Sequence, residues 1–79
     1  MVIFMVNLFS KRLKELRLSH NLKQTDMAKL LEINERNYQR YEGNNPSLPK
    51  INNLIILADY FNVSIDYLLG RTDNPNINK

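Results

Sequence analysis

The sequence predicts an all-α fold, a compact domain of five short helices. Apolar residues recur three or four positions apart along almost the whole chain, which is the period of an amphipathic helix. After residue 8 the chain shows none of the strict apolar–polar alternation that a half-buried strand would produce. Asparagine, serine and glycine stand where the periodic segments break, and these residues commonly cap or stop helices. The length of 79 residues leaves room for one core.

The first helix is expected to end near Asn21, because asparagine tolerates the left-handed backbone of a helix stop. Phe9, Leu13 and Leu16 share one side of it. The preceding residues 1–7 include the apolar run MVIFMV and are expected as an arm or as a lead-in to this helix. This run is too short for a membrane span and lacks the basic start and cleavage site of a secretory signal.

Two helices of about eight residues should follow, joined by a three-residue break. The second is predicted over about residues 24–31. The third should begin at Asn34, whose side chain is a good N-cap, and should end at Gly43. Ile33 and Tyr38 have the spacing of a hydrophobic staple across the start of the third helix. Two helices joined in this way have the form of a helix-turn-helix unit.

The third helix is predicted to turn only Tyr38 and Tyr41 toward the core. Its outer side then carries long polar side chains that match the hydrogen-bonding groups of base edges: Glu35, Arg36, Asn37, Gln39 and Arg40. A polar outer face is also the ordinary state of a solvated surface helix, so this pattern alone does not decide the function.

Two further helices complete the predicted core. Pro49 suits the first turn of the fourth helix, which Asn62 should end. Its inner face is predicted to consist of Ile51, Leu54, Ile55, Ala58 and Phe61. The fifth helix should begin at the N-cap Ser64 and close at Gly70, with Val63 and Leu68 as a second staple. Residues 71–79 lack an apolar face and are expected as a flexible tail.

Composition and charge narrow the function classes. The chain has no cysteine and a single histidine, His20, so it offers no thiolate metal site, cysteine nucleophile or histidine cluster. Residues 1–50 hold nine Lys and Arg against five Asp and Glu, whereas residues 51–79 hold two against three. The basic surplus in the N-terminal part favours an anionic partner on that side. Carboxylates scattered over separate helices give no catalytic grouping, so we expect no enzyme, no cofactor and no metal.

Several fragments, in order and correctly spaced, resemble the Cro/phage-repressor type helix-turn-helix family, also called the XRE family. They are LKQTDMA at residues 22–28, RYE at residues 40–42 and ADYFNVSIDYLLGRTDNP at residues 58–75. The resemblance covers residues 12–75. It implies a lambda-repressor-like DNA-binding domain over about residues 8–70, with the helix-turn-helix unit at about 24–43. It also implies a bacterial or phage transcriptional regulator, with a repressor as the expected form and with the third helix in the major groove.

The resemblance also implies a set of DNA contacts by position. Those to bases would come from Asn34, Glu35, Arg36, Asn37 and Gln39. Those to phosphates would come from Lys23, Gln24, Thr25, Arg40, Asn44, Asn45 and Lys50. Gln24 would in addition buttress the third helix.

Four departures from the family pattern bear on these assignments. Lys23 replaces the usual Thr or Ser cap of the second helix, and Tyr38 replaces a β-branched residue. Glu32 replaces the common glycine of the turn, so a non-glycine residue is expected there with a strained φ. The loop over residues 42–49 is one residue longer than the common form, which affects the positions of Asn44 and Asn45.

The expected partners are double-stranded DNA and a second copy of the chain on a two-fold operator. Ile56 on the fourth helix and Ile3 and Phe4 near the N-terminus are candidate dimer contacts. Alternatively, the N-terminal residues cap the molecule's own core, or translation begins at Met5. An antitoxin or another protein-interaction module of the same fold is the second functional hypothesis. No membrane segment is expected, and the protein is expected in the cytoplasm.

Overall fold

A computed structural model describes residues 2–43 and 47–76 of the protein, with side chains from residue 7 onward. The described residues form five helices. The helices are α1 (Val2–Ser19), α2 (Gln24–Leu31), α3 (Glu35–Glu42), α4 (Ile51–Phe61) and α5 (Ile65–Leu68). The described residues form no strand, which confirms the all-α prediction. Residues 2–7 continue directly into the first helix. None of the described helices combines the length and apolar character that a membrane crossing requires.

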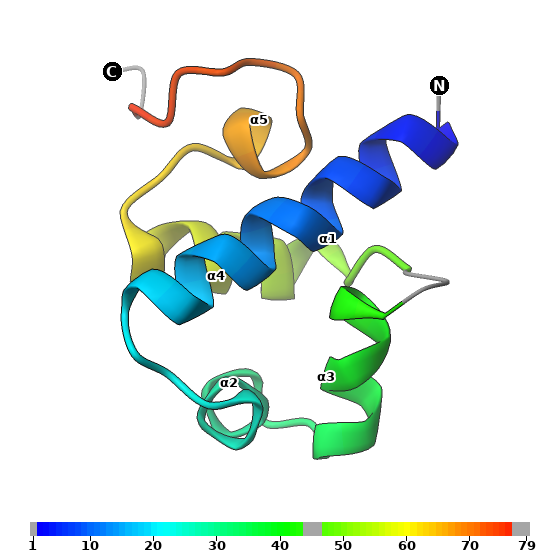
Figure 1. The fold of residues 1–79 in the computed structure, drawn as a ribbon, viewed down its shortest axis with the longest axis vertical. Coiled ribbons are helices and arrows are strands. Elements are labelled where there is room, and N and C mark those ends of the chain that lie inside the picture. Colours follow the sequence, from blue (N-terminus) through cyan, green and yellow to red (C-terminus); the bar gives the residue numbers. More distant parts are fainter. Residues whose placement is uncertain (1, 44–46, 77–79) are drawn as a thin grey trace.

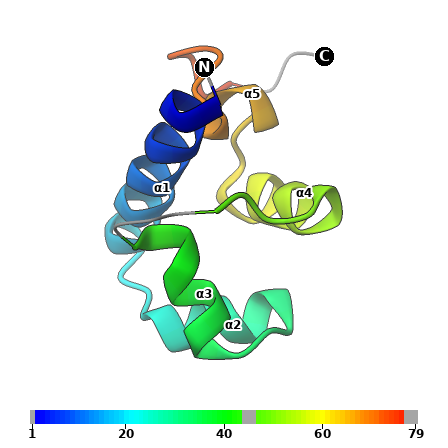
Figure 2. The ribbon, with the colours of Figure 1, turned by 90° about the vertical axis from the view of Figure 1, so that its right-hand side faces the viewer.

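The long helix α1 runs across the molecule and joins its two ends (Figure 1). At one end α2 and α3 pack against each other, and α3 also packs against α1. At the other end α5 packs against both α1 and α4 (Figures 1 and 2). The helix-turn-helix pair therefore projects from one end of a scaffold formed by the other three helices.

The core lies where all five helices meet. Its largest fully buried side chains are Tyr38, Phe9, Leu13, Met27, Leu57 and Leu68, which come from every helix. Burial of each such apolar side chain contributes about 1.5–3 kcal/mol. Short helices like these are marginal by themselves, so this shared core is what holds α2, α3 and α5 in place.

Cap geometry confirms the predicted starts of α3 and α5. Asn34 Oδ1 accepts a hydrogen bond of 2.8 Å from Asn37 N, and Ser64 Oγ accepts one of 3.0 Å from Tyr67 N. Three helices end at left-handed residues: φ is 56° at Asn21, 55° at Glu32 and 56° at Asn62. The strained φ expected at Glu32 is thus present, and such a conformation costs a non-glycine residue about 1–2 kcal/mol.

The inner face of α4 differs from the prediction. Ile51 and Ile55 were expected in the core but are 64% and 45% exposed, and Leu57 is buried in their place. The apolar run of α4 contains two overlapping stripes of correct helical spacing, and packing against α5 selects the stripe with Leu57. The predicted position of Pro49 in the first turn of this helix is also wrong. Pro49 is buried, but it precedes the N-cap Lys50 and lies outside the helix.

The segment after α5 was expected as a flexible tail, yet residues 72–75 are tied to the body of the domain. The guanidinium of Arg12 donates a hydrogen bond of 2.7 Å to the carbonyl of Thr72 and one of 2.8 Å to Asp73. It also donates to the carbonyl of Tyr67 and lies 4.1 Å above the centre of that ring. Ser64 N donates to the carbonyl of Pro75 at 2.9 Å. The attachment depends on backbone carbonyls, which apolar periodicity does not reveal.

Candidate nucleic-acid interface

The outer side of α3 is a continuous exposed polar surface. Every side chain that was predicted to contact a base is exposed, and these are Asn34, Glu35, Arg36, Asn37 and Gln39. The neighbouring Arg40 is exposed as well. These residues are turned outward because Tyr38, Tyr41 and Glu42 occupy the opposite side of the helix. Tyr38 is fully buried, and its ring meets that of Tyr41 edge to face at 6.0 Å.

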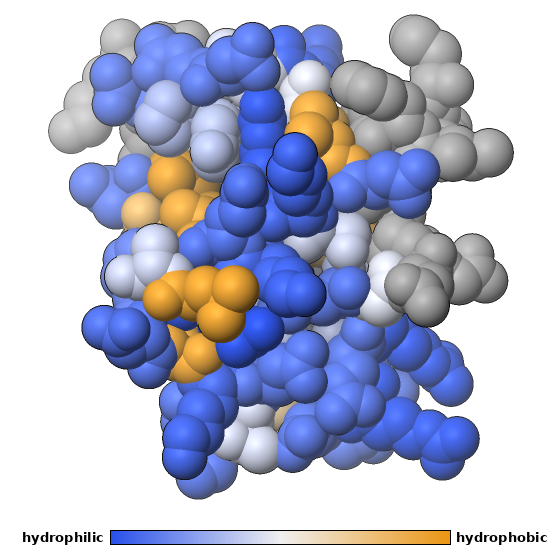
Figure 3. Space-filling model, viewed as in Figure 1, coloured by the Kyte–Doolittle hydropathy of each residue, from blue (hydrophilic) through white to orange (hydrophobic). Residues whose placement is uncertain are grey.

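The surface formed by α2 and α3 is almost wholly hydrophilic on the side that Figure 3 shows. Apolar surface on the same side lies over α1, where it reaches close to α2, and in the region of α5. On this side the surface of the two helices offers many hydrogen-bond donors and acceptors. The positions predicted to contact bases therefore lie in surroundings suited to a hydrated, polar ligand.

A buried carboxylate fixes α3 to the scaffold, and this corrects the prediction that only two tyrosines face inward. The side chain of Glu42 is 3% exposed. Its two oxygens accept hydrogen bonds from Arg17 Nε at 2.8 Å and from Arg17 Nη2 at 3.0 Å. The Tyr38 hydroxyl donates to the same carboxylate, and Gln24 Nε2 lies 3.3 Å from it. We refer to Arg17, Gln24, Tyr38 and Glu42 as the Glu42 network.

The Glu42 network joins α3 to α1 and α2, and it therefore determines how α3 is oriented on the domain. Arg17 belongs to α1, Gln24 to the first turn of α2, and the other two to α3. Arg17 Nη1 also donates to the carbonyl of Leu22 at 2.9 Å, which holds the link between α1 and α2. The buttressing role that the resemblance implied for Gln24 is seen in its contact with Glu42.

The environment of the network favours the protonated forms of Arg17 and Tyr38. The hydrogen bond to Glu42 raises the pKa of Arg17, which therefore stays charged. Burial and the hydrogen bond to Glu42 raise the pKa of the Tyr38 phenol above its usual value, so the phenol keeps its proton at neutral pH and donates it. A bidentate guanidinium–carboxylate pair of this type also fixes the relative orientation of the two helices.

A shallow groove of about 540 Å³ lies between α1, the start of α2 and the first residue of α3. Its walls include Lys14 of α1, Lys23 before α2, Thr25 in the first turn of α2 and Glu35 of α3. Lys23 and Thr25 are exposed, as phosphate contacts would require, whereas Gln24 is half-buried. The groove brings together the predicted contacts around the start of α2, and it adds Lys14, which was not predicted.

The start of α2 keeps half of a capping box despite its lysine. Lys23 cannot accept a hydrogen bond through its ammonium group, but its backbone N–H donates to Asp26 Oδ2 at 2.8 Å. The free amides of the first helical turn carry a partial positive charge, which attracts an anion. The lysine side chain is therefore available to a ligand at a helix end that is already basic.

The basic surplus of residues 1–50 divides into internal and surface charges. Arg12 and Arg17 are each 8% exposed and are held by Asp73 and Glu42. The other cations of this part are exposed, and these are Lys11, Lys14, Lys23, Lys29, Arg36, Arg40 and Lys50. Sequence reasoning missed the internal role of the two arginines, because a charged residue at an inward helical position looks like a surface residue until its partner is known.

Of the remaining predicted residues, the structure describes the side chains of Lys50 and Ile56. Lys50 is the exposed N-cap residue of α4. Asn44 and Asn45, and the side chains of Ile3 and Phe4, lie outside the described residues. Ile56 is 37% exposed on α4.

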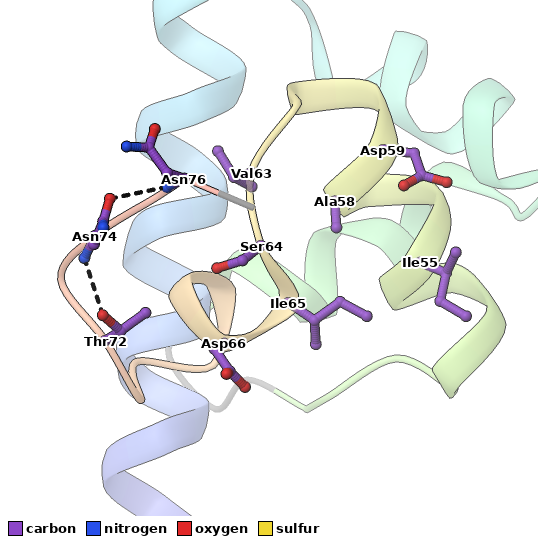
Figure 4. Close-up of a pocket in the computed structure, with 10 residues that line it drawn as sticks. All are labelled: Ile55, Ala58, Asp59, Val63, Ser64, Ile65, Asp66, Thr72, Asn74 and Asn76. Carbon is purple, nitrogen blue, oxygen red and sulfur yellow. Dashed lines mark hydrogen bonds between the residues drawn. The ribbon is translucent and has the colours of Figure 1, made fainter. Parts of the chain in front are cut away.

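A separate pocket of about 400 Å³ lies between α4, α5 and the C-terminal segment (Figure 4). Its lining combines the apolar side chains of Ile55 and Ile65 with the carboxylates of Asp59 and Asp66. Thr72, Asn74 and Asn76 form its rim and are joined by hydrogen bonds. Its described lining includes no Lys or Arg, so it does not suit a polyanion and is distinct from the surface of α3.

Comparison with known proteins places this arrangement among transcriptional regulators. A family model described as helix-turn-helix matches residues 13–68. The uncharacterized HTH-type transcriptional regulator YobD of Bacillus subtilis (strain 168) is 36% identical over 69 residues, which are 87% of this chain and 61% of that protein. The HTH-type transcriptional regulator ImmR of the same organism is 38% identical over 63 residues, 80% of this chain and 49% of that protein. The chain thus spans about half to three-fifths of the length of these relatives. No solved structure matches it.

Proposed function

Because the chain belongs to the helix-turn-helix family of transcriptional regulators, we propose that it binds a specific double-stranded DNA sequence with α3 in the major groove. The observation that carries this proposal is the exposed polar surface of α3 above a buried anchor. One side of the helix is fixed by Tyr38 and the Glu42 network, and the other presents only polar side chains. An α-helix fits the major groove, where each base pair shows a distinct pattern of donors and acceptors.

The residue types on α3 suit individual bases. Arg36 can donate two hydrogen bonds to guanine, Asn37 or Gln39 can pair with adenine, and Glu35 can accept from the amino group of cytosine. Asn34 has a more restricted role, because its side-chain oxygen already caps α3 and its amide nitrogen is the group left for a base. We propose these five residues as the base-reading set.

Phosphate contacts would position the helix on the duplex. Lys23 and Thr25 line the groove at the start of α2, and Arg40 lies one turn beyond Arg36 on α3. Gln24 can keep one N–H on Glu42 and offer the other to a phosphate. Lys50 precedes α4, where a second helix start faces solvent. Such contacts hold the register but do not discriminate sequence.

We propose that the protein acts as a repressor, since a bound domain at a promoter would block RNA polymerase. We also propose a homodimer on a two-fold operator, which is the common arrangement for this motif. The exposed apolar side chains of α4 support a protein–protein contact. They are Ile51, Ile55, Ile56 and Tyr60, of which Ile56 was the predicted dimer contact, and the exposed Asn52 and Asp59 lie on the same side of the helix.

The same apolar side of α4 favours one alternative function. If a different protein covers it, the chain would be an antitoxin or another protein-interaction module of the same fold. Isolated exposed apolar residues are common on protein surfaces, but several large ones along one short helix are not. In that case the α3 surface would not need to select any base sequence.

Selection from random duplex DNA, followed by sequencing, tests the proposal directly. We expect enrichment of a short motif, and a palindromic motif if the protein binds as a dimer. Binding that is equally strong to all duplexes would show contacts with phosphate alone. Absence of binding would overturn the proposal and favour the protein-interaction function.

A further inference from the structure

Within the base-reading set, Glu35 and Gln39 are joined by a hydrogen bond. Gln39 Nε2 donates to Glu35 Oε2 at 3.1 Å, one helical turn apart on the exposed side of α3. Glu35 also borders the groove that contains Lys14 and Lys23. Nevertheless, the ion pairs found among the described residues join Arg12 to Asp73 and Arg17 to Glu42, and Glu35 takes part in neither. Among the described residues, the side-chain hydrogen-bond partner of Glu35 is the neutral amide of Gln39.

This bond determines which groups Gln39 can offer to a base. A glutamine amide has two N–H donors and one carbonyl acceptor. Adenine requires one donor and one acceptor, for N7 and N6, whereas guanine requires two donors, for N7 and O6. With one N–H directed to Glu35, Gln39 retains one donor and one acceptor. It can then satisfy adenine but not guanine.

Glu35 is affected in the complementary way. Its carboxylate only accepts hydrogen bonds, and the bond from Gln39 occupies part of one oxygen. The other oxygen remains available for the amino group of cytosine. Without Glu35 the side-chain amide of Gln39 could rotate freely. It could then present both N–H donors to a base, or exchange the positions of its donor and its acceptor.

We infer that Glu35 and Gln39 read the operator as one unit, in which Glu35 accepts from a cytosine and restricts Gln39 to a neighbouring adenine. This inference rests on the proposed DNA-binding function and adds that specificity at the base facing Gln39 is set by a residue that does not touch it. The alternative is that the bond only supports the helix, as exposed pairs four residues apart often do.

The test compares base preferences of the wild type with those of Glu35→Ala, Gln39→Ala, the double variant and Glu35→Gln. After selection, the dissociation constant is measured for all four bases at each enriched position. For Glu35→Ala we expect loss of the cytosine preference and, at a second position, a fall of the adenine-over-guanine preference from about tenfold or more to near one. Glu35→Gln should restore the adenine preference, since its carbonyl can still accept from Gln39, but should not restore cytosine.

Asn37→Ala provides the matched control, because Asn37 is exposed on α3 and points away from this pair around the helix. It should change a position of its own and leave the base facing Gln39 unaltered. If Glu35→Ala changed one position only, with the two single substitutions acting independently, the coupling would be refuted while the DNA-binding function would stand. If the wild type selected no motif, both would be refuted together.

Discussion

Helices α3 and α4 each bury one side in the same core, yet they expose opposite kinds of surface. α3 shows solvent only polar side chains and is anchored in part by a buried ion pair. α4 is anchored by Leu54, Leu57, Ala58 and Phe61, and exposes three isoleucines and a tyrosine. The polar surface suits a hydrated partner that is read by hydrogen bonds, whereas the apolar one suits a protein surface that excludes water. This difference is the basis on which we propose two separate contact faces, one for DNA and one for a protein.

The largest effect is expected from breaking the anchor of α3. Replacement of Arg17 by methionine would leave the carboxylate of Glu42 buried without its charge partner, and we expect a loss of about 3–5 kcal/mol in the free energy of unfolding. Chemical denaturation followed by circular dichroism measures this. The double variant Arg17→Met/Glu42→Leu should recover most of the loss, because no charge is then left buried. Equal losses for the single and double variants would show that packing, not charge, is the source.

The next effect concerns the outer side of α3. Arg36→Ala should weaken binding to the selected operator by about 1–3 kcal/mol and relax the preference at one base pair. The free energy of unfolding should not change, since Arg36 is exposed. Titration of duplexes that differ at single positions is the measurement. An equal loss on every sequence would instead mean that Arg36 contacts only phosphate.

The outer side of α4 can be tested by adding charge. Ile56→Lys should weaken self-association by about tenfold or more if two copies meet on this face, and sedimentation velocity should then show a shift toward monomer. Leu18→Lys is the control, because Leu18 is an exposed apolar residue on α1 that is 54% exposed. Unchanged sedimentation of the Ile56 variant, or an equal shift in both, would exclude a contact specific to α4.

The smallest effect is expected at the start of α2. Lys23→Ala should weaken binding by a similar factor on all sequences and should flatten the dependence of log K on log salt by about one unit. Lys29→Ala serves as the control, because Lys29 is also exposed but lies in the last turn of α2. Affinity measured across a series of salt concentrations gives both slopes. The same slope in wild type and Lys23→Ala would remove Lys23 from the phosphate-binding set.

Local signals in the sequence were sufficient for most of the helix boundaries, although not for the start of α4. Asn34 and Ser64 cap helices, and Asn21 and Asn62 end them, because these preferences arise from the backbone of a few adjacent residues. The residues on the outer face of α3 could also be predicted, because apolar periodicity indicates that Tyr38 faces the core. The order of elements and the exposed position of the candidate site were therefore predictable.

Contacts between distant residues were not predictable in the same way. Arg17 and Glu42 are 25 positions apart, and Arg12 and Asp73 are 61 apart, so no local pattern marks them as partners. The choice between Ile55 and Leu57 on α4 likewise depends on how that helix is rotated against α5. The bond between Glu35 and Gln39 lies at ordinary helical spacing, but the spacing alone does not show that the two side chains meet.

The attachment of residues 72–75 through Arg12 and Ser64 has a practical consequence for measurement. This segment lies at the end of the molecule opposite α2 and α3 (Figure 1). A dye or surface tether joined within residues 72–75 would start from a fixed point remote from α3. Such a label would report rotation and displacement of the whole domain on DNA. Motion of the label relative to the domain would contribute little to the signal.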